Sequence, residues 1–148
     1  MKDIGKGKKL THRTGNLISH VAALMHVSFG RRLKKYDVTR SQWMIMAAIF
    51  GNDAETAADI AKIWTLDATA VTRLVDRLEA KGLVKRIHDV ADSRINRLEL
   101  TEQGQRLSPI LKDEADANHD YVFGALTETE EKQLRKLLSK ILKHLSSS

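Results

Sequence analysis

Hydroxyl, guanidinium and carboxylate side chains share one face of the segment from Leu66 to Gly82. They are Thr69, Thr72, Arg73, Asp76 and Arg77. The opposite face has apolar residues at i, i+3, i+4 and i+7, the stripe that a helix turns toward a core. These are Val71, Leu74, Val75 and Leu78. Hydroxyls and arginines on a short helix can reach base edges and phosphates in a major groove, so the segment predicts a DNA recognition helix. Asp67 is expected to cap its start, and Gly82 to end it in a left-handed conformation.

Two shorter helices are expected before this segment. Thr39–Gln42 has the pattern of a capping box and opens a helix over residues 41–51, which is apolar nearly all round and therefore expected to be buried. Thr56–Asp59 is a second capping box that opens another short helix. A short helix joined by a tight turn to a second helix with a polar, basic outer face is typical of a helix-turn-helix.

A β-hairpin is predicted after the recognition helix, because the apolar period changes to two. Residues 83–88 and 95–100 are expected to be strands joined by the polar turn Asp89–Arg94. A hairpin in this place is a wing, and Arg94 at its tip can enter a minor groove, whose negative potential attracts arginine. Asp92 repels phosphate, so we expect it to orient Arg94 or to cap the turn. The alternative interpretation of Arg94 is a solvated hairpin charge.

Basic residues are unevenly distributed along the 148 residues of the chain. Residues 1–100 carry 18 lysines and arginines against 11 aspartates and glutamates, whereas residues 101–148 carry 7 against 8. The length predicts one domain or two small lobes that share a core, and a hydrophobic content of 42% with 30% charged residues predicts a globular protein. The basic surplus lies in the part that holds the predicted recognition helix, as phosphate neutralisation requires. It favours nucleic acid over a membrane surface, which would also need an exposed apolar face.

Membrane insertion, secretion and thiol chemistry find no support in the sequence. The longest apolar run, Trp43–Phe50, is far shorter than the roughly 20 residues that span a bilayer. Residues 1–9 have the pattern of a mobile basic tail and not of a signal peptide. The chain has no cysteine, which excludes disulfides, thiolate metal sites and thiol redox switches. We therefore expect a cytoplasmic protein with no membrane partner.

Long helices near both chain ends are expected to form a dimer interface. One is predicted over residues 10–34, and another from Thr101 to about Leu126, interrupted in register by Pro109. The last helix has the longest apolar stripe of the chain, at Leu134, Leu137, Leu138, Ile141, Leu142 and Leu145. Helices from both chain ends, packed against those of a second copy, would bury this stripe and give a homodimer. The alternative is that the stripe packs on the first helix of its own chain.

Three motifs in the middle of the chain resemble the signature of the MarR family (multiple antibiotic resistance regulators). They are VTRLVDRLEAKGLVKR at Val71–Arg86, DSR at Asp92–Arg94 and LTEQG at Leu100–Gly104. The specific match covers residues 56–104, and the flanking helices agree in kind and length. The resemblance implies a dimeric regulator of transcription that binds palindromic double-stranded DNA, with one recognition helix in each half-site.

The resemblance also implies domain bounds and residue roles. The chain would be a single domain, 1–148, mainly α with a small β-hairpin. It would consist of a winged helix-turn-helix lobe at 36–104 and dimerisation helices at 1–35 and 105–148. Arg94 of each wing would enter the flanking minor groove beside Asp92. The family's recognition-helix contacts fall on Thr69, Ala70, Thr72 and Arg73.

Many members of that family release DNA when a small phenolic or other aromatic anion binds between the dimer helices and the DNA-binding lobe. In this chain the crevice would lie near the first two helices. Candidate lining groups there are Arg13, Asn16, His20 and Trp43. Arginine can pair with an anion and tryptophan can stack on a ring. The alternative interpretation of Trp43, in a largely apolar helix, is a core residue.

Other classes of function have weaker support. The sequence has no glycine-rich phosphate loop, nucleophile motif or metal-ligand cluster, so we expect neither an enzyme nor a cofactor. His20 and His26 are six residues apart, which places them on nearly opposite helix faces and argues against a metal site. Asp76 and Glu79 are better explained as solvated charge than as acid/base machinery. A non-specific or architectural DNA-binding protein remains the alternative function, because it would carry the same basic surplus.

Overall fold

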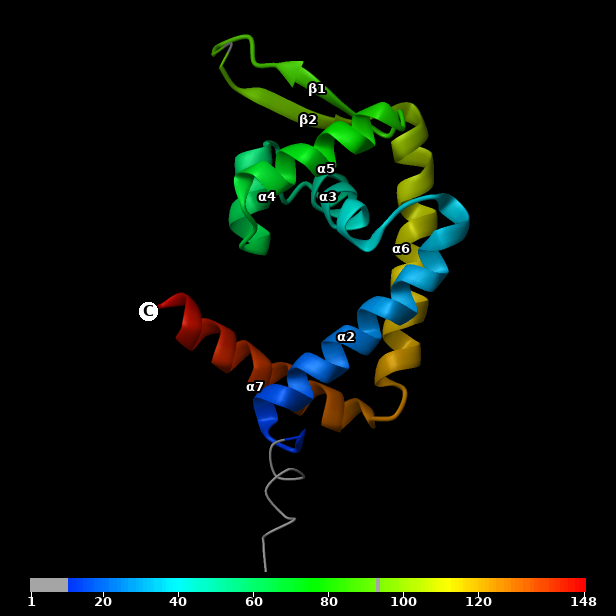
Figure 1. The fold of residues 1–148 in the computed structure, drawn as a ribbon, viewed down its shortest axis with the longest axis vertical. Coiled ribbons are helices and arrows are strands. Elements are labelled where there is room, and N and C mark those ends of the chain that lie inside the picture. Colours follow the sequence, from blue (N-terminus) through cyan, green and yellow to red (C-terminus); the bar gives the residue numbers. More distant parts are fainter. Residues whose placement is uncertain (1–10, 93) are drawn as a thin grey trace, which may run out of the picture.

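The computed structural model describes residues 11–92 and 94–148, and the basic tail expected at residues 1–9 lies outside them. Long helices flank a group of shorter helices and a β-hairpin (Figure 1). The elements are α2 (Thr14–Leu33), the 3-10 helix η1 (Lys34–Tyr36), α3 (Arg40–Phe50), α4 (Ala57–Trp64), α5 (Ala68–Ala80), β1 (Val84–His88), β2 (Asn96–Leu100), α6 (Glu102–Phe123) and α7 (Glu128–Ser146). This mainly helical fold with a small hairpin confirms the predicted fold class.

The short helices and the hairpin gather in one lobe, and α6 runs from this lobe to the opposite end of the molecule (Figure 1). α2 packs along α6, where the Ser28 hydroxyl donates a hydrogen bond of 2.5 Å to the side-chain oxygen of Asn118. α7 follows α6 at the end far from the lobe, and none of its residues is buried. The predicted recognition elements are therefore separate in space from the last helix.

Capping boxes start α3 and α4, as predicted. The Thr39 hydroxyl accepts the backbone N–H of Gln42 at 3.1 Å, and the Gln42 side chain accepts the backbone N–H of Thr39 at 3.1 Å. Thr56 and Asp59 exchange the same pair of bonds at the start of α4. The backbone N–H groups of Glu55 and Thr56 hold the pKa of the Asp59 carboxyl below its usual range, because they hydrogen-bond its charged form.

The predicted recognition helix, α5, begins and ends near the expected residues. Asp67 occupies its N-cap position, but its side chain makes no capping hydrogen bond, so that part of the prediction is wrong. Gly82 has a φ of 71°, which confirms the left-handed conformation expected after the helix. The chain therefore turns sharply from α5 into β1.

One hydrophobic core lies beneath α5. Val71, Val75 and Leu78 of the predicted stripe have no exposed surface, and Leu74 is half-buried. The central position predicted for α3 is confirmed, since five of its eleven residues are buried and only Ser41 and Phe50 are exposed. The core also receives side chains from the neighbouring elements: Leu33, Ile45, Met46, Ile60, Val84, Leu98, Leu100 and Leu111.

The start of α6 is held directly against the chain that leaves α5. The Thr101 hydroxyl accepts the backbone N–H of Gly104 at 3.1 Å and donates to the carbonyl of Gly82 at 2.6 Å. A Cβ atom on Gly104 would lie 2.1 Å from the carbonyl oxygen of Leu83. The glycine of the LTEQG motif is therefore required by this close approach of two backbones.

We expect Gly104→Ala to lower the free energy of unfolding by about 2 kcal/mol, because the methyl group meets backbone atoms that cannot move aside. Gly30→Ala is the matched control. It lies inside α2, where a methyl group would meet no neighbouring element within 4 Å, and alanine favours helix. Denaturant unfolding of both variants checks the prediction. Equal stability of Gly104→Ala and the parent would contradict the close approach.

α6 runs unbroken through Pro109, so the interruption predicted there is wrong. Proline removes the N–H that would bond the carbonyl of Gln105, but both residues are exposed, and water can satisfy that carbonyl. The neighbouring Ser108 hydroxyl donates to the carbonyl of Gly104 at 2.8 Å. Among the described helices, none is long and apolar enough to cross a membrane.

Candidate nucleic-acid interface

The outer face of α5 presents the predicted contact groups to solvent. All five are exposed: Thr69, Ala70, Thr72, Arg73 and Arg77. Within residues 11–92 and 94–148, the side chains of Arg73 and Arg77 form no hydrogen bond or ion pair. The Thr72 hydroxyl donates to the carbonyl of Ala68 at 3.0 Å, which leaves its oxygen free to accept and its methyl group free for apolar contact. The face therefore offers cations, a hydroxyl acceptor and methyl groups, which is the chemistry that reads base edges.

Hydrogen bonds to Asp92 hold Arg94 at the tip of the hairpin. The backbone N–H of Asp89 donates to the carbonyl of Ile95 at 2.9 Å, and the N–H of Ile95 donates to the carbonyl of Asp92 at 3.0 Å. The Asp92 carboxylate accepts the backbone N–H of Arg94 at 3.0 Å and its side-chain Nε at 3.1 Å. These bonds hold the pKa of Asp92 below its usual range, since they favour the charged carboxylate. Arg94 itself is 89% exposed, so Asp92 orients the guanidinium without covering it.

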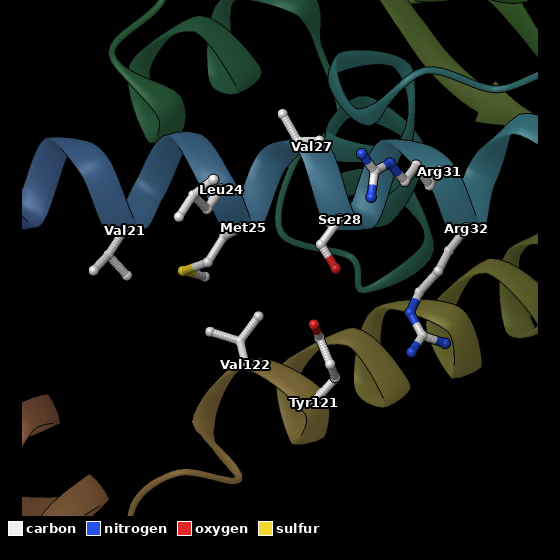
Figure 2. A pocket seen from close by; sticks show the side chains of 9 residues that line it. All are labelled: Val21, Leu24, Met25, Val27, Ser28, Arg31, Arg32, Tyr121 and Val122. Atoms are coloured by element: carbon white, nitrogen blue, oxygen red, sulfur yellow. The ribbon is translucent and has the colours of Figure 1, made fainter.

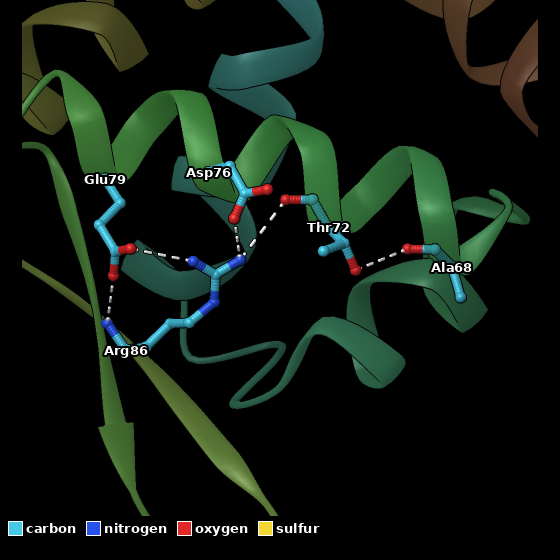
Figure 3. Close-up of polar contacts among 5 residues, drawn as sticks. All are labelled: Ala68, Thr72, Asp76, Glu79 and Arg86. Atoms are coloured by element: carbon cyan, nitrogen blue, oxygen red, sulfur yellow. Dashed lines mark hydrogen bonds and ion pairs between the residues drawn. The ribbon is translucent and has the colours of Figure 1, made fainter.

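Arg86 of β1 joins the hairpin to α5, as Figure 3 shows. Its Nη2 lies 2.6 Å from Oδ1 of Asp76, and its Nη1 lies 3.0 Å from Oε1 of Glu79. The other carboxylate oxygen of Glu79 accepts the backbone N–H of Arg86 at 3.2 Å. Two acidic residues of the recognition helix therefore share one arginine of the wing.

Sequence reasoning missed the role of Arg86. It interpreted Asp76 and Glu79 as solvated charge, and both are indeed partly exposed, but each also belongs to an ion pair. A usable signal existed, because residues three apart on a helix share a face and a basic residue follows after the turn. Recognising it required the geometry of the turn at Gly82, which brings β1 back beside the helix.

The second strand of the wing is tied to the loop before α4. The Nε of Arg97 lies 3.3 Å from a carboxylate oxygen of Asp89, and its Nη2 lies 3.8 Å from Glu55. The backbone N–H of Leu98 donates to the carbonyl of Glu55 at 2.8 Å, and Thr56 forms a β-bridge with Arg97. Both strands are therefore attached to the helix-turn-helix, β1 through Arg86 and β2 through this loop.

The four residues predicted to bind a small anion do not share one surface. Arg13, Asn16 and His20 are exposed, Arg13 directly before α2 and the other two in its first half, whereas Trp43 is 7% exposed and belongs to the core. The burial of Trp43 agrees with the alternative interpretation of that residue. A different cavity, of about 620 Å³, lies between α2 and α6 (Figure 2). Its lining combines two arginines with a tyrosine and apolar side chains: Val21, Leu24, Met25, Val27, Ser28, Arg31, Arg32, Tyr121 and Val122.

In the part of the chain that the structure describes, no group of three or more histidine, aspartate or glutamate side chains is placed to hold a metal ion. His119 is instead paired with a carboxylate, since its Nε2 lies 3.2 Å from Oε1 of Glu131 on α7. Its ring also contacts Phe123, with 4.8 Å between the ring centroids. The contact between His119 and Glu131 therefore links α6 to α7.

Comparison with known proteins relates the chain to regulators of transcription. A family model described as "MarR family" matches residues 36–95, which include α3, α4, α5, β1 and the wing turn. The HTH-type transcriptional regulator SarZ from Staphylococcus haemolyticus is 34% identical over 91 residues. That alignment covers 62% of this chain and 59% of SarZ.

Two solved structures with bound DNA have the same fold. A mutant MarR from E. coli complexed with operator DNA has a TM-score of 0.82 and 26% identity, over 95% of this chain and 99% of that chain. The MepR–DNA complex from S. aureus has a TM-score of 0.83 and 25% identity, over 89% of this chain and 98% of that chain. The fold similarity therefore extends well beyond the segment that the family model matches.

Proposed function

Because the chain belongs to the MarR family of winged-helix transcriptional regulators, we propose that it is a repressor that binds a palindromic operator as a homodimer. The observation that carries the proposal is the shared exposure of Arg73 on α5 and Arg94 on the wing, both in one lobe. A major-groove helix and a minor-groove arginine can then contact the same half-site.

Readout of a palindrome requires two such lobes at a fixed separation. Two recognition helices enter successive major grooves of one DNA face when they lie about 34 to 36 Å apart, which is one helical turn. The exposed apolar residues of α2 and α7 support a second copy of this chain as the source of the second lobe. They are Leu17, Ile18, Val21, Leu24, Val27, Leu137, Leu138, Ile141, Leu142 and Leu145.

We also propose that a small aromatic anion weakens DNA binding by changing the separation of the two lobes. The cavity between α2 and α6 supports this class of ligand, because Arg31 and Arg32 can pair with an anion and Tyr121 can stack on a ring. Contacts by Arg13, Asn16 and His20 stay a prediction. Titration of phenolic acids, followed by tryptophan fluorescence, tests ligand binding, and the absence of a saturable change with any of them would contradict it.

Arg73→Ala is expected to weaken operator binding about tenfold and to relax base preference within the half-site, because an arginine that reads a base contributes both affinity and discrimination. Binding to the operator and to single-base variants of each half-site measures the two effects. Arg106→Gln is the control, since it removes one exposed positive charge near the start of α6. If Arg73→Ala kept the base preference of the parent, Arg73 would not be a residue that contacts base edges.

Selection of bound fragments from genomic DNA tests the proposed function. Recovery of an inverted repeat, with half-sites one helical turn apart, is the expected result. Enrichment of no sequence, together with binding that collapses steeply as salt rises, would instead identify a non-specific or architectural DNA-binding protein.

A further inference from the structure

Arg86 extends from β1 of the wing to α5 and so links the two elements that are proposed to contact DNA (Figure 3). The side chain is 25% exposed, which is less than either of its partners on α5: Asp76 is 60% and Glu79 is 45% exposed. Its guanidinium reaches both carboxylates, and the backbone of the same residue is held by Glu79. Side chain and backbone together therefore fix β1 against the recognition helix.

We propose that Arg86 is a positioning residue for DNA recognition, which sets the angle between the recognition helix and the wing so that both reach their grooves on one half-site. The proposal rests on the proposed function and goes beyond it, since it assigns to one side chain the direct link between the recognition helix and the wing, beside the attachment of β2 to the loop before α4. Arg86 acts through α5 and the wing and is not itself the base-reading group.

The need for such a group follows from the connection between α5 and β1. The two elements are joined by a short turn that contains Gly82, whose φ of 71° is left-handed. Arg86 forms its bonds across that turn, so it opposes rotation about the glycine together with the Thr101 hydroxyl, which donates to the Gly82 carbonyl. Because β1 and β2 are paired from Val84 to His88, a rotation at the turn would also carry Arg94 at the hairpin tip.

The negative charges of Asp76 and Glu79 give a second reason to assign a positioning role to Arg86. Thr72, Asp76 and Glu79 follow one another at helical spacing, so two carboxylates continue the line of a predicted DNA contact. Phosphates repel these carboxylates, and Arg86 both offsets their charge and turns them toward the wing. Ion pairs with this exposure add little to global stability, so opening them leaves the fold intact while it releases the helix from the wing.

The test uses two DNA duplexes to separate the positioning role of Arg86 from the effect of its charge on DNA affinity. The first carries the inverted repeat that the fragment selection recovers. The second has one base pair inserted between each half-site and its flank, which rotates the flank by about 35° relative to the recognition helix. The ratio of the two dissociation constants then measures how rigidly the wing is held. The parent is expected to bind the inserted duplex about a hundredfold more weakly, since the wing contact, worth roughly tenfold, is lost in each of the two half-sites.

Two variants remove the ion pairs between Arg86 and the carboxylates of α5, one by changing the arginine and the other by changing the carboxylates. Arg86→Gln removes a positive charge, whereas Asp76→Asn with Glu79→Gln removes two negative charges, so their overall affinities are expected to shift in opposite directions. Both are nevertheless expected to reduce the ratio between the duplexes to about threefold or less, because a loosened wing can follow the displaced flank. The second variant keeps the test valid if the first does not fold, and Arg106→Gln is the charge control that keeps the parent ratio.

If both variants kept the parent's ratio of dissociation constants and changed only in overall affinity, the positioning role would be overturned. Arg86 would then affect DNA binding only through its positive charge. A parent that binds both duplexes equally would also overturn it. Neither result would affect the proposed function, which fails separately if the selection recovers no inverted repeat.

Discussion

Leu142→Glu is expected to bind the operator about a thousandfold more weakly than the parent, because a single lobe that reads one half-site approaches non-specific affinity. Leu142 is 66% exposed in the single chain, so the substitution costs the protomer little. In a dimer the same residue would place a carboxylate in an apolar interface, where a charge without a partner is strongly unfavourable. Sedimentation and operator binding, measured on the same sample, check the expected loss of both dimer and affinity.

Lys136→Gln is the matched control, since it also lowers the charge of α7 by one but lies on the face opposite the apolar stripe. It is expected to keep the dimer and the parent affinity. A Leu142→Glu protein that remains dimeric and binds like the parent would show that the stripe of α7 is not the interface. An unchanged circular dichroism spectrum establishes that any loss does not come from unfolding.

Arg94→Ala is expected to lower affinity about a hundredfold, because the dimer loses a minor-groove contact in both wings and each is worth roughly tenfold. The effect should depend on the flanks. A narrow minor groove in A·T-rich DNA attracts arginine, so the parent is expected to prefer such flanks and the variant to bind A·T and G·C flanks alike. Competition between duplexes that differ only in their flanks measures the preference.

Val90→Ala is the control for this experiment. Val90 lies at the same hairpin tip and is fully exposed, so its truncation tests whether any change in the turn is sufficient to weaken binding. It is expected to bind like the parent. If Arg94→Ala retained the flank preference, Arg94 would be the solvated hairpin charge that the sequence also allowed.

Local signals in the sequence predicted much of the fold. The capping boxes at Thr39 and Thr56 fixed the starts of α3 and α4, because each depends on residues only three apart. Gly82 marked the end of α5 in the same local way. The stripe of α5 also predicted which residues would be buried, since helical period alone determines the face that turns inward.

The failures of prediction depend on contacts between distant residues or on solvent. Pro109 is a helix breaker in general, yet it lies on the exposed face of α6, where water can replace the lost hydrogen bond. The sequence did not reveal why Gly104 must be glycine, because the constraint comes from the carbonyl of Leu83 in another element. Arg86 was missed for the same reason, since its partners lie across the turn between α5 and β1.

The candidate site also has some features that local sequence predicts and others that depend on packing between distant residues. The exposed face of α5 and the turn between Asp92 and Arg94 could be predicted, because each lies within a single element or turn. The anion site could not be assembled from sequence, since pairing Trp43 with residues of the first helix required knowledge of the packing between helices. In the structure Trp43 faces the core, and the cavity between α2 and α6 has a different lining.

Hydroxyl-radical footprinting of the selected DNA tests the central claim most directly, because it maps contacts on both strands at the resolution of single nucleotides. We expect two equivalent protected regions related by two-fold symmetry, with centres about one helical turn apart, and further minor-groove protection on each outer flank. Protection of a single half-site, or uniform protection without symmetry, would contradict sequence-specific binding by a dimer with two recognition helices and two wings.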